Sequence, residues 1–347
     1  MRIFVGMSGG VDSSLTAALL KEQGHEVRGV FIKGWYPEGF PCTWQEDRVD
    51  AMRVAAQLGI PFSTLDLSAQ YKESVIDYLF AEYEAGRTPN PDILCNRDIK
   101  FGHFLDWAKA HGAETIATGH YAQSKDGHLY RGIDEGKDQS YFLYTLHSDQ
   151  LRFVQFPLGS LTKEKTRTQA RARSLPVATK RDSQGLCFLG TFDMQAFLST
   201  YIDTEPGVVL DTYGSEIGTH EGAVIYTLGQ RHGFTVTTGS EEPLYVLSKD
   251  LAANTITVGP AHAQHTNTPT HLHVEKTSWV QAFPEIKDTL TAQYRYHGPK
   301  ISISDIEKTE TGARVTFDEA LPETPAAGQS LVVYSGTECI GGGVIVY

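Results

Sequence analysis

A glycine-rich turn near the start of the chain constrains its fold more than any other feature. Residues 5–14 read Val-Gly-Met-Ser-Gly-Gly-Val-Asp-Ser-Ser, between the apolar run Ile3–Val5 and the helix-forming run Leu15–Lys21. Strand, tight turn and helix start in this order form a cradle for phosphate. Glycine lets the backbone approach an anion closely, and the first N–H groups of a helix carry partial positive charge. The sequence therefore predicts a nucleotide-binding loop here.

The residues of this loop exclude one common class of phosphate site. A Walker A loop has a lysine directly after its last glycine, whereas Val11 and Asp12 follow Gly10. A carboxylate beside a triphosphate is favourable mainly when a magnesium ion lies between the like charges. The pattern Ser-Gly-Gly-x-Asp-Ser is similar to the PP-loop of the N-type ATP pyrophosphatases, which cut ATP between the α and β phosphates. A glycine turn capped by Ser and Asp is the alternative interpretation.

Strands and helices alternate through the first third of the chain. The expected strands are Ile3–Val5, Glu26–Ile32, Ile60–Leu67 and Glu114–Thr118, and the expected helices are Leu15–Lys21, Glu46–Leu58, Ala69–Ala85 and Asn96–His111. This order is typical of a doubly wound parallel sheet. Ligands bind such sheets at the carboxyl ends of the strands, which is where the glycine loop lies. We therefore expect an α/β catalytic domain at residues 1–202.

The second part of the chain favours β-structure. Beyond about Ile202, glycine and proline separate short runs that are rich in Val, Ile, Thr and Tyr. Closely spaced short strands of this kind predict small β-barrels. A polar stretch at 262–269 divides them, so we expect a central β domain at 203–264 and a C-terminal β-barrel domain at 265–347.

Charge and composition limit the function classes. The net charge of −12 argues mildly against a general nucleic-acid binder, because phosphate contacts need Lys and Arg. Residues 162–181 are nevertheless rich in Lys and Arg, with Glu164 as the only acid before Arg181. Such a run is either a patch that steers one particular polyanion or a solvated helix face, and the charges alone do not choose between them.

The sequence predicts a cytoplasmic protein. No apolar run is long enough to span a membrane, and Met1 leads almost directly into the first strand, without a signal peptide. Four cysteines in 347 residues are not a disulfide framework. No C-x-x-C or H-x-x-x-H pair suggests a zinc site, so no protein-held metal is expected.

Two cysteines are candidates for chemistry. Cys95 and Cys187 each lie in a polar, turn-rich stretch, the setting of reactive rather than structural cysteines. Taken singly, each could be an ordinary buried thiol, and we assign no role to Cys42 or Cys339. Beside a nucleotide-activating loop, one thiol could carry sulfur as a persulfide and the other could attack it, resolving through a disulfide.

Several motifs in the same order resemble the bacterial tRNA-specific 2-thiouridylase family. They are the loop at 6–13, Gly-Arg-Thr-Pro-Asn-Pro-Asp-Ile-Leu-Cys-Asn at 86–96, Ala-Thr-Gly-His-Tyr at 117–121, Lys-Asp-Gln-Ser-Tyr-Phe-Leu at 137–143, Gly-Leu-Cys-Phe at 185–188, Thr-Leu-Gly-Gln-Arg at 227–231, Gly-Gln-Ser at 328–330 and Cys-Ile-Gly-Gly-Gly at 339–343. The resemblance covers essentially the whole chain. It implies an adenine-nucleotide α-hydrolase-like first domain and ATP-dependent 2-thiolation of the wobble uridine in tRNAs for lysine, glutamate and glutamine.

The resemblance also implies a reaction and its participants. ATP with Mg²⁺ would adenylate the C2 oxygen, a transient persulfide on Cys187 would deliver sulfur, and a Cys95–Cys187 disulfide would form during turnover. The sulfur would come from a donor protein, either a cysteine desulfurase or a relay protein. Asp92 is placed to exchange a proton, or alternatively to cap the helix that follows.

Residue roles follow by the same resemblance. The implied catalytic residues are Asp12, Asp92, Cys95 and Cys187. The implied ATP-binding residues are Gly6, Met7, Ser8, Gly9, Gly10, Val11, Asp12, Ser13, Ile32 and Gly119, where the family more often has Met in place of Ile32. Asn90, Pro91 and Asp92 would touch the flipped uridine, since chemistry on a stacked base requires its extrusion. Further tRNA contacts would come from His120, Lys137, Asp138, Gln139, Arg295, Tyr296 and Gln329.

Two other functions stay open at this level. A PP-loop enzyme that adenylates a carbonyl and then accepts ammonia or an amine needs the loop but neither cysteine. An RNA-binding protein whose nucleotide loop is only structural would bind tRNA without releasing pyrophosphate.

Overall fold

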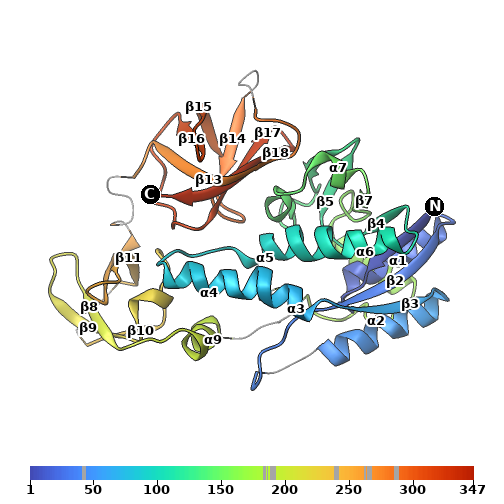
Figure 1. The fold of residues 1–347 in the computed structure, drawn as a ribbon, viewed down its shortest axis with the longest axis horizontal. Helices are drawn as coiled ribbons and strands as arrows, with labels where there is room; N and C mark the ends of the chain where they lie inside the picture. Colours follow the sequence, from blue (N-terminus) through green and yellow to red (C-terminus); the bar gives the residue numbers. More distant parts are fainter. Residues whose placement is uncertain are drawn as a thin grey trace.

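The computed structural model shows a parallel-sheet domain followed by two β-rich regions (Figure 1). It describes residues 1–40, 44–182, 185, 187, 193–237, 242–261, 263, 268–284 and 289–347. The α/β fold class with β-barrel domains after it is confirmed. The domain limits at residues 202 and 264 stay predictions.

The first domain is built on a five-stranded sheet of order β3-β2-β1-β4-β7, in which every neighbouring pair is parallel. Its strands are β1 (Arg2–Gly6), β2 (Glu26–Lys33), β3 (Phe62–Asp66), β4 (Thr115–Ala117) and β7 (Val154–Gln155). The chain moves outward from β1 in one direction and then returns to its other side at β4. Such a reversal leaves a crevice at the carboxyl ends of β1 and β4.

Alternating side chains of β1 fill two separate cores, as the two-residue period of a strand requires. Ile3 and Val5 pack in the core that includes residues of α1 (Val11–Glu22), α2 (Trp44–Leu58) and α8 (Lys163–Ala172). Phe4 faces the other core, with residues of the helices between β3 and β4. Helices therefore cover both faces of the sheet.

Two long helical stretches lie between β3 and β4, and each contains a segment with wider, π-type turns. The first is α3 (Ser68–Tyr71), η1 (Lys72–Ile76) and α4 (Asp77–Glu84), and the second is α5 (Pro91–Leu94), η2 (Cys95–His103) and α6 (Phe104–Ala110). The second stretch begins at Pro91, so the predicted start at Asn96 was wrong. The Asn90 side chain accepts a hydrogen bond from the Asp92 backbone N–H at 3.2 Å, and proline suits the first helical position because it lacks an N–H.

A hairpin of the first domain joins the C-terminal sheet, and this pairing was not predicted from the sequence. It consists of β5 (Ala122–Lys125) and β6 (His128–Arg131), and β6 pairs with β18. The short elements η3 (Ser140–Leu143) and α7 (Ser148–Leu151) follow, and α9 (Met194–Tyr201) precedes the β-rich regions.

The central region is a five-stranded sheet of order β10-β9-β8-β12-β11. Its elements are β8 (Gly207–Leu210), β9 (Glu216–His220), η4 (Ala223–Ile225), β10 (Phe234–Val236), β11 (Leu244–Asp250) and β12 (Thr255–Pro260). Strands β8 and β12 are parallel and the other neighbours are antiparallel.

The C-terminal region closes into a barrel, because β13 pairs with both β16 and β18. Its strands are β13 (His271–Trp279), β14 (Leu290–Gln293), β15 (Ile301–Lys308), β16 (Gly312–Phe317), β17 (Ser330–Ser335) and β18 (Glu338–Val346). Figure 1 shows this barrel over α4 and α5, with the parallel sheet to one side and the central sheet to the other. Among the helices that the structure describes, none is long and apolar enough to cross a membrane.

Candidate nucleotide and thiol sites

The predicted nucleotide loop follows β1 directly, at the crevice between β1 and β4. Gly9 has φ +74°, and a Cβ there would lie 2.2 Å from the Asp47 carbonyl oxygen. Gly119, after β4, lies so close to the loop that its Cβ would be 2.8 Å from the Ser13 backbone nitrogen. Both positions therefore require glycine. Gly119 lies against the loop, and ATP binding by these residues stays a prediction.

Hydroxyl groups stabilise the loop from within. The Ser8 backbone N–H donates to Ser13 Oγ at 3.1 Å, and the hydroxyl of Ser14 donates to the Gly10 carbonyl at 2.7 Å. Met7 fixes the strand end, since its N–H donates to the Val30 carbonyl at 2.8 Å. Ile32 is buried near the end of β2. The loop is thus held by its own residues and by the neighbouring strand.

Asp12 projects from the first turn of α1 into a pair of polar contacts. Lys163 Nζ lies 2.8 Å from each of its carboxylate oxygens, and the Tyr121 hydroxyl donates to Oδ1 at 2.9 Å. Burial and the nearby Asp12 carboxylate raise the pKa of the Tyr121 phenol, so it stays a donor. The loop has no lysine of its own, but Lys163 in the first turn of α8 places its ammonium beside Asp12.

Asp182 connects three basic side chains. Its carboxylate lies 2.9 Å from Lys163 Nζ and 3.1 Å from Lys137 Nζ, and it also accepts from Arg167. Burial alone would raise the pKa of Asp182, but the hydrogen bonds from Lys163 and Lys137 lower it to about 2. The carboxylate is therefore charged at neutral pH and links α8, the Lys137 loop and the segment before Cys187.

The basic run at 162–181 is neither a bare polyanion patch nor a freely solvated face. Besides the contacts of Lys163 and Arg167, Arg173 pairs with Glu22, and Lys180 lies 2.7 Å from both Asp47 and Asp50. These partners come from α1 and α2, so much of the run serves to hold α8 against the sheet domain.

The two candidate thiols lie together, although they are far apart in sequence. Cys95 is fully buried at the start of η2, and hydrogen bonding couples its thiol to that of Cys187. Lys100 Nζ lies 3.3 Å from Cys187 Sγ. The Cys187 backbone is fixed on both sides, because its N–H donates to Asp92 Oδ1 at 3.1 Å and its carbonyl accepts from the Tyr71 hydroxyl at 2.8 Å.

These surroundings make the two thiols unequal. The hydrogen bond from Cys95 lowers the pKa of Cys187, and the Lys100 ammonium lowers it further against the effect of burial. Burial raises the pKa of Cys95 well above its usual range, and the neighbouring Cys187 raises it more. Burial would lower the pKa of Lys100, yet Cys187, Cys95 and Asp92 together raise it. These surroundings favour the thiolate form at Cys187 over Cys95, with the Cys95 thiol as its hydrogen-bond donor and Lys100 as its counter-ion.

The predicted RNA-contact loop at 137–139 is partly internal. Asp138 is buried and accepts from Arg131 Nη1 at 3.0 Å, from the Gly132 N–H at 3.0 Å and from Ser140. Gln139 is bonded twice to the Tyr121 backbone, through its side-chain oxygen at 3.0 Å and its N–H at 2.8 Å. Both residues position this loop, and their contact with RNA stays a prediction.

His120 is buried as well, between Phe101 and Phe156, and its Nδ1 lies 2.7 Å from the Thr118 hydroxyl. Burial lowers the pKa of His120 well below its usual range, and Lys100 adds to the effect. A neutral imidazole near the thiol pair is the result.

Residues of the C-terminal barrel reach the helical domain at two places. Tyr296 packs on Phe142 of η3 with ring centroids 4.5 Å apart, and Arg295 pairs with Glu323 at 2.8 Å. Gln329 donates to the Thr88 carbonyl at 2.8 Å, close to the Asn90–Asp92 turn. Tyr296 and Gln329 therefore contact η3 and the segment before Asn90, whereas Arg295 is paired within the C-terminal region.

Sequence reasoning missed Lys100, Tyr71, Lys163 and Asp182 as parts of these sites. Lys100 follows Cys95 by five residues, a spacing that brings side chains together on the wider turns of a π-type segment such as η2 but not on an ordinary helix. Tyr71 and Lys163 carry no such local signal, since only the fold brings them to their partners. Cys339 is a free, buried thiol of β18, and Cys42 lies outside the described residues. Among the residues described, no cluster of three ligating side chains could hold a metal ion.

Comparisons with known proteins cover the chain from end to end. Family models described as "tRNA methyl transferase HUP domain", "tRNA methyl transferase PRC-barrel domain" and "Aminomethyltransferase beta-barrel domain" match residues 1–191, 195–260 and 269–345. The tRNA-specific 2-thiouridylase MnmA 2 of Geobacillus kaustophilus is 44% identical over 99% of this chain and 94% of its own. The tRNA-specific 2-thiouridylases MnmA of Streptococcus mutans and Enterococcus faecalis are 44% and 43% identical, each over 99% of this chain and 95% of theirs. The chain belongs to the tRNA-specific 2-thiouridylase family.

Proposed function

We propose that the protein is a tRNA-uridine 2-sulfurtransferase that uses ATP to thiolate the wobble uridine of tRNAs for lysine, glutamate and glutamine. Relatives that carry this name match the whole chain. The observation that supports the proposal most is the contact between Cys187, Cys95 and Lys100. A PP-loop enzyme that transfers its activated group to ammonia needs no such thiol pair.

In the activation step, ATP would lie on the loop Gly6–Ser13, with Ile32 and Gly119 beside the nucleoside. The C2 oxygen of uridine would attack the α-phosphorus, forming a new O–P bond as the bond to the β-phosphate oxygen breaks and pyrophosphate leaves. Lys163 would supply positive charge to the phosphates, as a lysine does in other phosphate loops. Because Asp12 is already neutralised by Lys163, we expect Mg²⁺ to arrive with ATP and to touch Asp12 only as the lysine shifts.

Adenylation makes the sulfur step feasible. A ring carbonyl oxygen is a poor leaving group and AMP is a good one, which is the logic of covalent activation. The terminal sulfur of a Cys187 persulfide would attack C2, and the C–O bond to AMP would break. The Cys95 thiolate would then attack the Cys187 sulfur, forming the disulfide and releasing the thiocarbonyl of 2-thiouridine. A thiol reductant and a sulfur-donor protein would restore the starting state.

The residues around the thiols suit this sequence. Lys100 is protonated and would stabilise the anionic sulfur of Cys187, whereas the raised pKa of Cys95 keeps that thiol in reserve until a base removes its proton. Asp92 holds the Cys187 backbone through one oxygen. Its second oxygen would be the group that accepts the Cys95 proton.

The tRNA would bind across the catalytic domain and the barrel. Asn90, Pro91 and Asp92 would contact the flipped uridine. The RNA on either side of that uridine would lie beside Lys137, Arg295, Tyr296 and Gln329. Asp138, Gln139 and His120 would support these contacts, since the side chains are engaged inside the protein.

The test is pyrophosphate release with ATP, magnesium and unmodified tRNA, followed by mass analysis of the wobble nucleoside with a sulfide source present. We expect release that requires tRNA and the mass gain of one sulfur replacing one oxygen. Release without sulfur gain would favour adenylation with another acceptor. Absence of release would contradict the enzyme assignment and favour an RNA-binding protein.

A further inference from the structure

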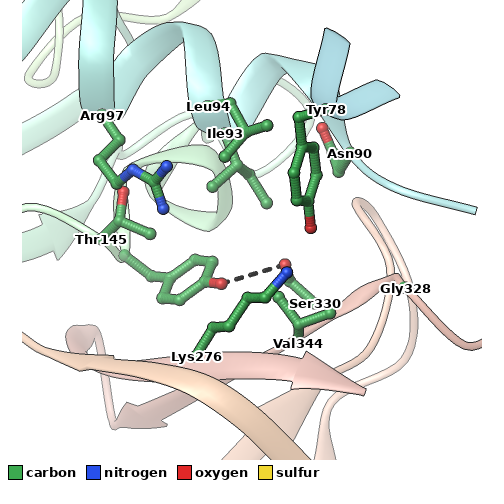
Figure 2. Close-up of a pocket in the computed structure, with 11 residues that line it drawn as sticks. Tyr78, Asn90, Ile93, Leu94, Arg97, Thr145, Lys276, Gly328, Ser330 and Val344 are labelled. Atoms are coloured by element: carbon green, nitrogen blue, oxygen red, sulfur yellow. Dashed lines mark hydrogen bonds between the residues drawn. The ribbon is translucent and has the colours of Figure 1, made fainter. Parts of the chain in front are cut away.

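A cavity of about 280 Å³ lies between the helical domain and the C-terminal barrel (Figure 2). Its helical side includes Tyr78 of α4 and Arg97 of η2, and its barrel side includes Lys276 of β13 and Ser330 of β17. Figure 2 shows Tyr78 and Lys276 entering the cavity from these two opposite sides. The volume is near the lower end of ligand pockets, so it suits one ring system rather than a whole cofactor.

The cavity is separate from the thiol pair. Asp92 and Asn96, one helical turn apart, point toward Cys187 and η3, and Lys100 continues that face. Leu94 and Arg97 line the cavity from the other face of the same helical stretch. The proposed sulfur transfer uses no group inside the cavity.

The two sites nevertheless meet at one residue. Asn90, the N-cap of α5, lines the cavity and also opens the turn that leads to Asp92. A helix is about 10 Å across. An RNA strand that places one base beside Asp92 therefore passes the cavity mouth within a few nucleotides.

The lining has the chemistry of a nucleotide pocket. Tyr78 supplies an aromatic ring, whereas Tyr144 is only 1% exposed and forms the floor of the cavity. Lys276 supplies positive charge, whereas the Arg97 guanidinium is already paired with both carboxylate oxygens of Asp98. The Lys276 ammonium lies 4.8 Å from the Tyr78 ring centroid and 3.4 Å from Glu82, with its side chain 55% exposed. Single-stranded RNA is bound by aromatic rings and cations in this combination.

One buried group of the lining lacks a partner. Thr145 is 5% exposed, and its hydroxyl makes no hydrogen bond in the part of the chain that the structure describes. By contrast, the Tyr144 hydroxyl lies 3.2 Å from Ser330 Oγ. A buried hydroxyl without a partner is unfavourable and requires an explanation. The Thr145 hydroxyl has almost no surface open to the cavity, but rotation about χ1 exchanges it with the methyl group of the same side chain. A ligand in the cavity would then provide a partner, because a nucleobase edge offers both donors and acceptors.

We propose that this cavity is a second nucleotide pocket, which receives the base of a nucleotide near the target uridine in the anticodon loop. The Thr145 hydroxyl bonds the base edge, and Lys276 contacts the adjoining phosphate. The inference rests on the proposed function, because it takes tRNA as the substrate.

The decisive variant is Thr145→Val, which removes the hydroxyl and keeps the shape. Loss of an unpartnered buried hydroxyl leaves the Tm of the free protein unchanged or raises it. The affinity for an anticodon stem–loop RNA falls by about 3- to 10-fold, the loss expected for one hydrogen bond. Thr145→Ser, which keeps a hydroxyl, binds the RNA like the wild type.

The occupant is identified with stem–loop RNAs that each lack one loop base. Removal of the base that enters the pocket should weaken binding by the wild type. On that abasic RNA, Thr145→Val should bind as tightly as the wild type, because the contact of the hydroxyl is already lost, and this is the coupling expected of direct contact. Lys276→Met reduces the slope of log affinity against log salt concentration by the amount expected for about one phosphate contact. Lys308→Met, on β15 of the same barrel, leaves that slope unchanged.

Two results overturn the inference. The first is Thr145→Val binding every RNA as tightly as the wild type. The second is an equal loss on every abasic RNA, which would indicate a general change of fold. If the wild type thiolates tRNA and either result is found, only the pocket inference is wrong. If the wild type binds no RNA, both the pocket inference and the proposed function are wrong.

Discussion

The nucleotide loop and the thiol pair are built on different principles. The loop is a contiguous segment whose anion-binding groups are backbone N–H groups, and its geometry depends on Gly9 and on Gly119 beside it. The thiol pair joins distant parts of the chain, and its chemistry depends on side chains, chiefly Lys100. Because the two sites share no side chain among the contacts described here, single substitutions should separate adenylation from sulfur transfer.

Burial alone does not make a reactive cysteine, as Cys339 shows. It is as buried as Cys95, and burial raises its pKa far above the usual range, with Asp138 adding to the effect. Cys187 differs because a thiol donor and an ammonium both face its sulfur.

Cys187→Ser should separate adenylation from sulfur transfer more strongly than any other substitution considered. Sulfur gain at the wobble nucleoside should fall to background, because serine cannot carry a persulfide, while tRNA-dependent pyrophosphate release continues. Mass analysis and a pyrophosphate assay measure the two steps on the same sample. Cys339→Ser is the matched control and should keep both. Loss of pyrophosphate release in Cys187→Ser would show that the two sites act as one.

Lys163→Met tests the other site. Without the ammonium, the Asp12 carboxylate faces the phosphates of ATP uncompensated, and a charge-assisted contact is lost. A loss of about 1.5–3 kcal/mol corresponds to a rise of roughly 10- to 100-fold in the KM for ATP. Steady-state pyrophosphate release at varied ATP measures it. Lys165→Met, on the same helix and exposed, should leave the KM unchanged, and an equal rise in both variants would refute a specific role of Lys163.

The same contrast explains how much the sequence could predict. The strand–loop–helix unit is local, so the residues at 2–22 were sufficient to predict β1, the loop and α1. The helix at Pro91 was predicted too late, because Asn90 and Pro91 were not recognised as an N-cap and a first helical position. Cys95 and Cys187 were identified as a pair only through their motifs and the resemblance.

The partners of these residues could not be predicted. Lys163 was visible only as one charge in a basic run, and nothing local connects it with Asp12, which lies 151 residues away in the sequence. Tyr71 reaches the Cys187 carbonyl only because the fold brings the end of α3 beside that cysteine. Asp138 was assigned to RNA contact by resemblance, whereas its burial and internal bonds follow from the pairing of β6 with β18.

Lys100→Met should change the reactivity of Cys187 without substrates. Besides the hydrogen bond from Cys95, the Lys100 ammonium lowers the pKa of Cys187, so its removal raises that pKa. The midpoint of iodoacetamide alkylation against pH should shift upward, and alkylation below the midpoint should slow by the factor by which the thiolate fraction falls. Peptide mass analysis assigns the alkylated cysteine. Lys100→Arg keeps the charge and should keep the lower midpoint, and a midpoint that is the same in all three proteins would exclude Lys100 as the counter-ion.

Tyr71→Phe should give the smallest effect, confined to the thiol site. The substitution removes the hydrogen bond to the Cys187 carbonyl, which contributes about 1 kcal/mol and corresponds to roughly a fivefold slower sulfur transfer. Single-turnover formation of 2-thiouridine measures this rate, and the KM for ATP should not change. Tyr83→Phe, in the neighbouring helix α4 and also buried, is the matched control and should keep both values. A change in the KM for ATP would mean that Tyr71 acts on both sites, whereas an unchanged transfer rate would mean that the Cys187 backbone is held by Asp92 alone.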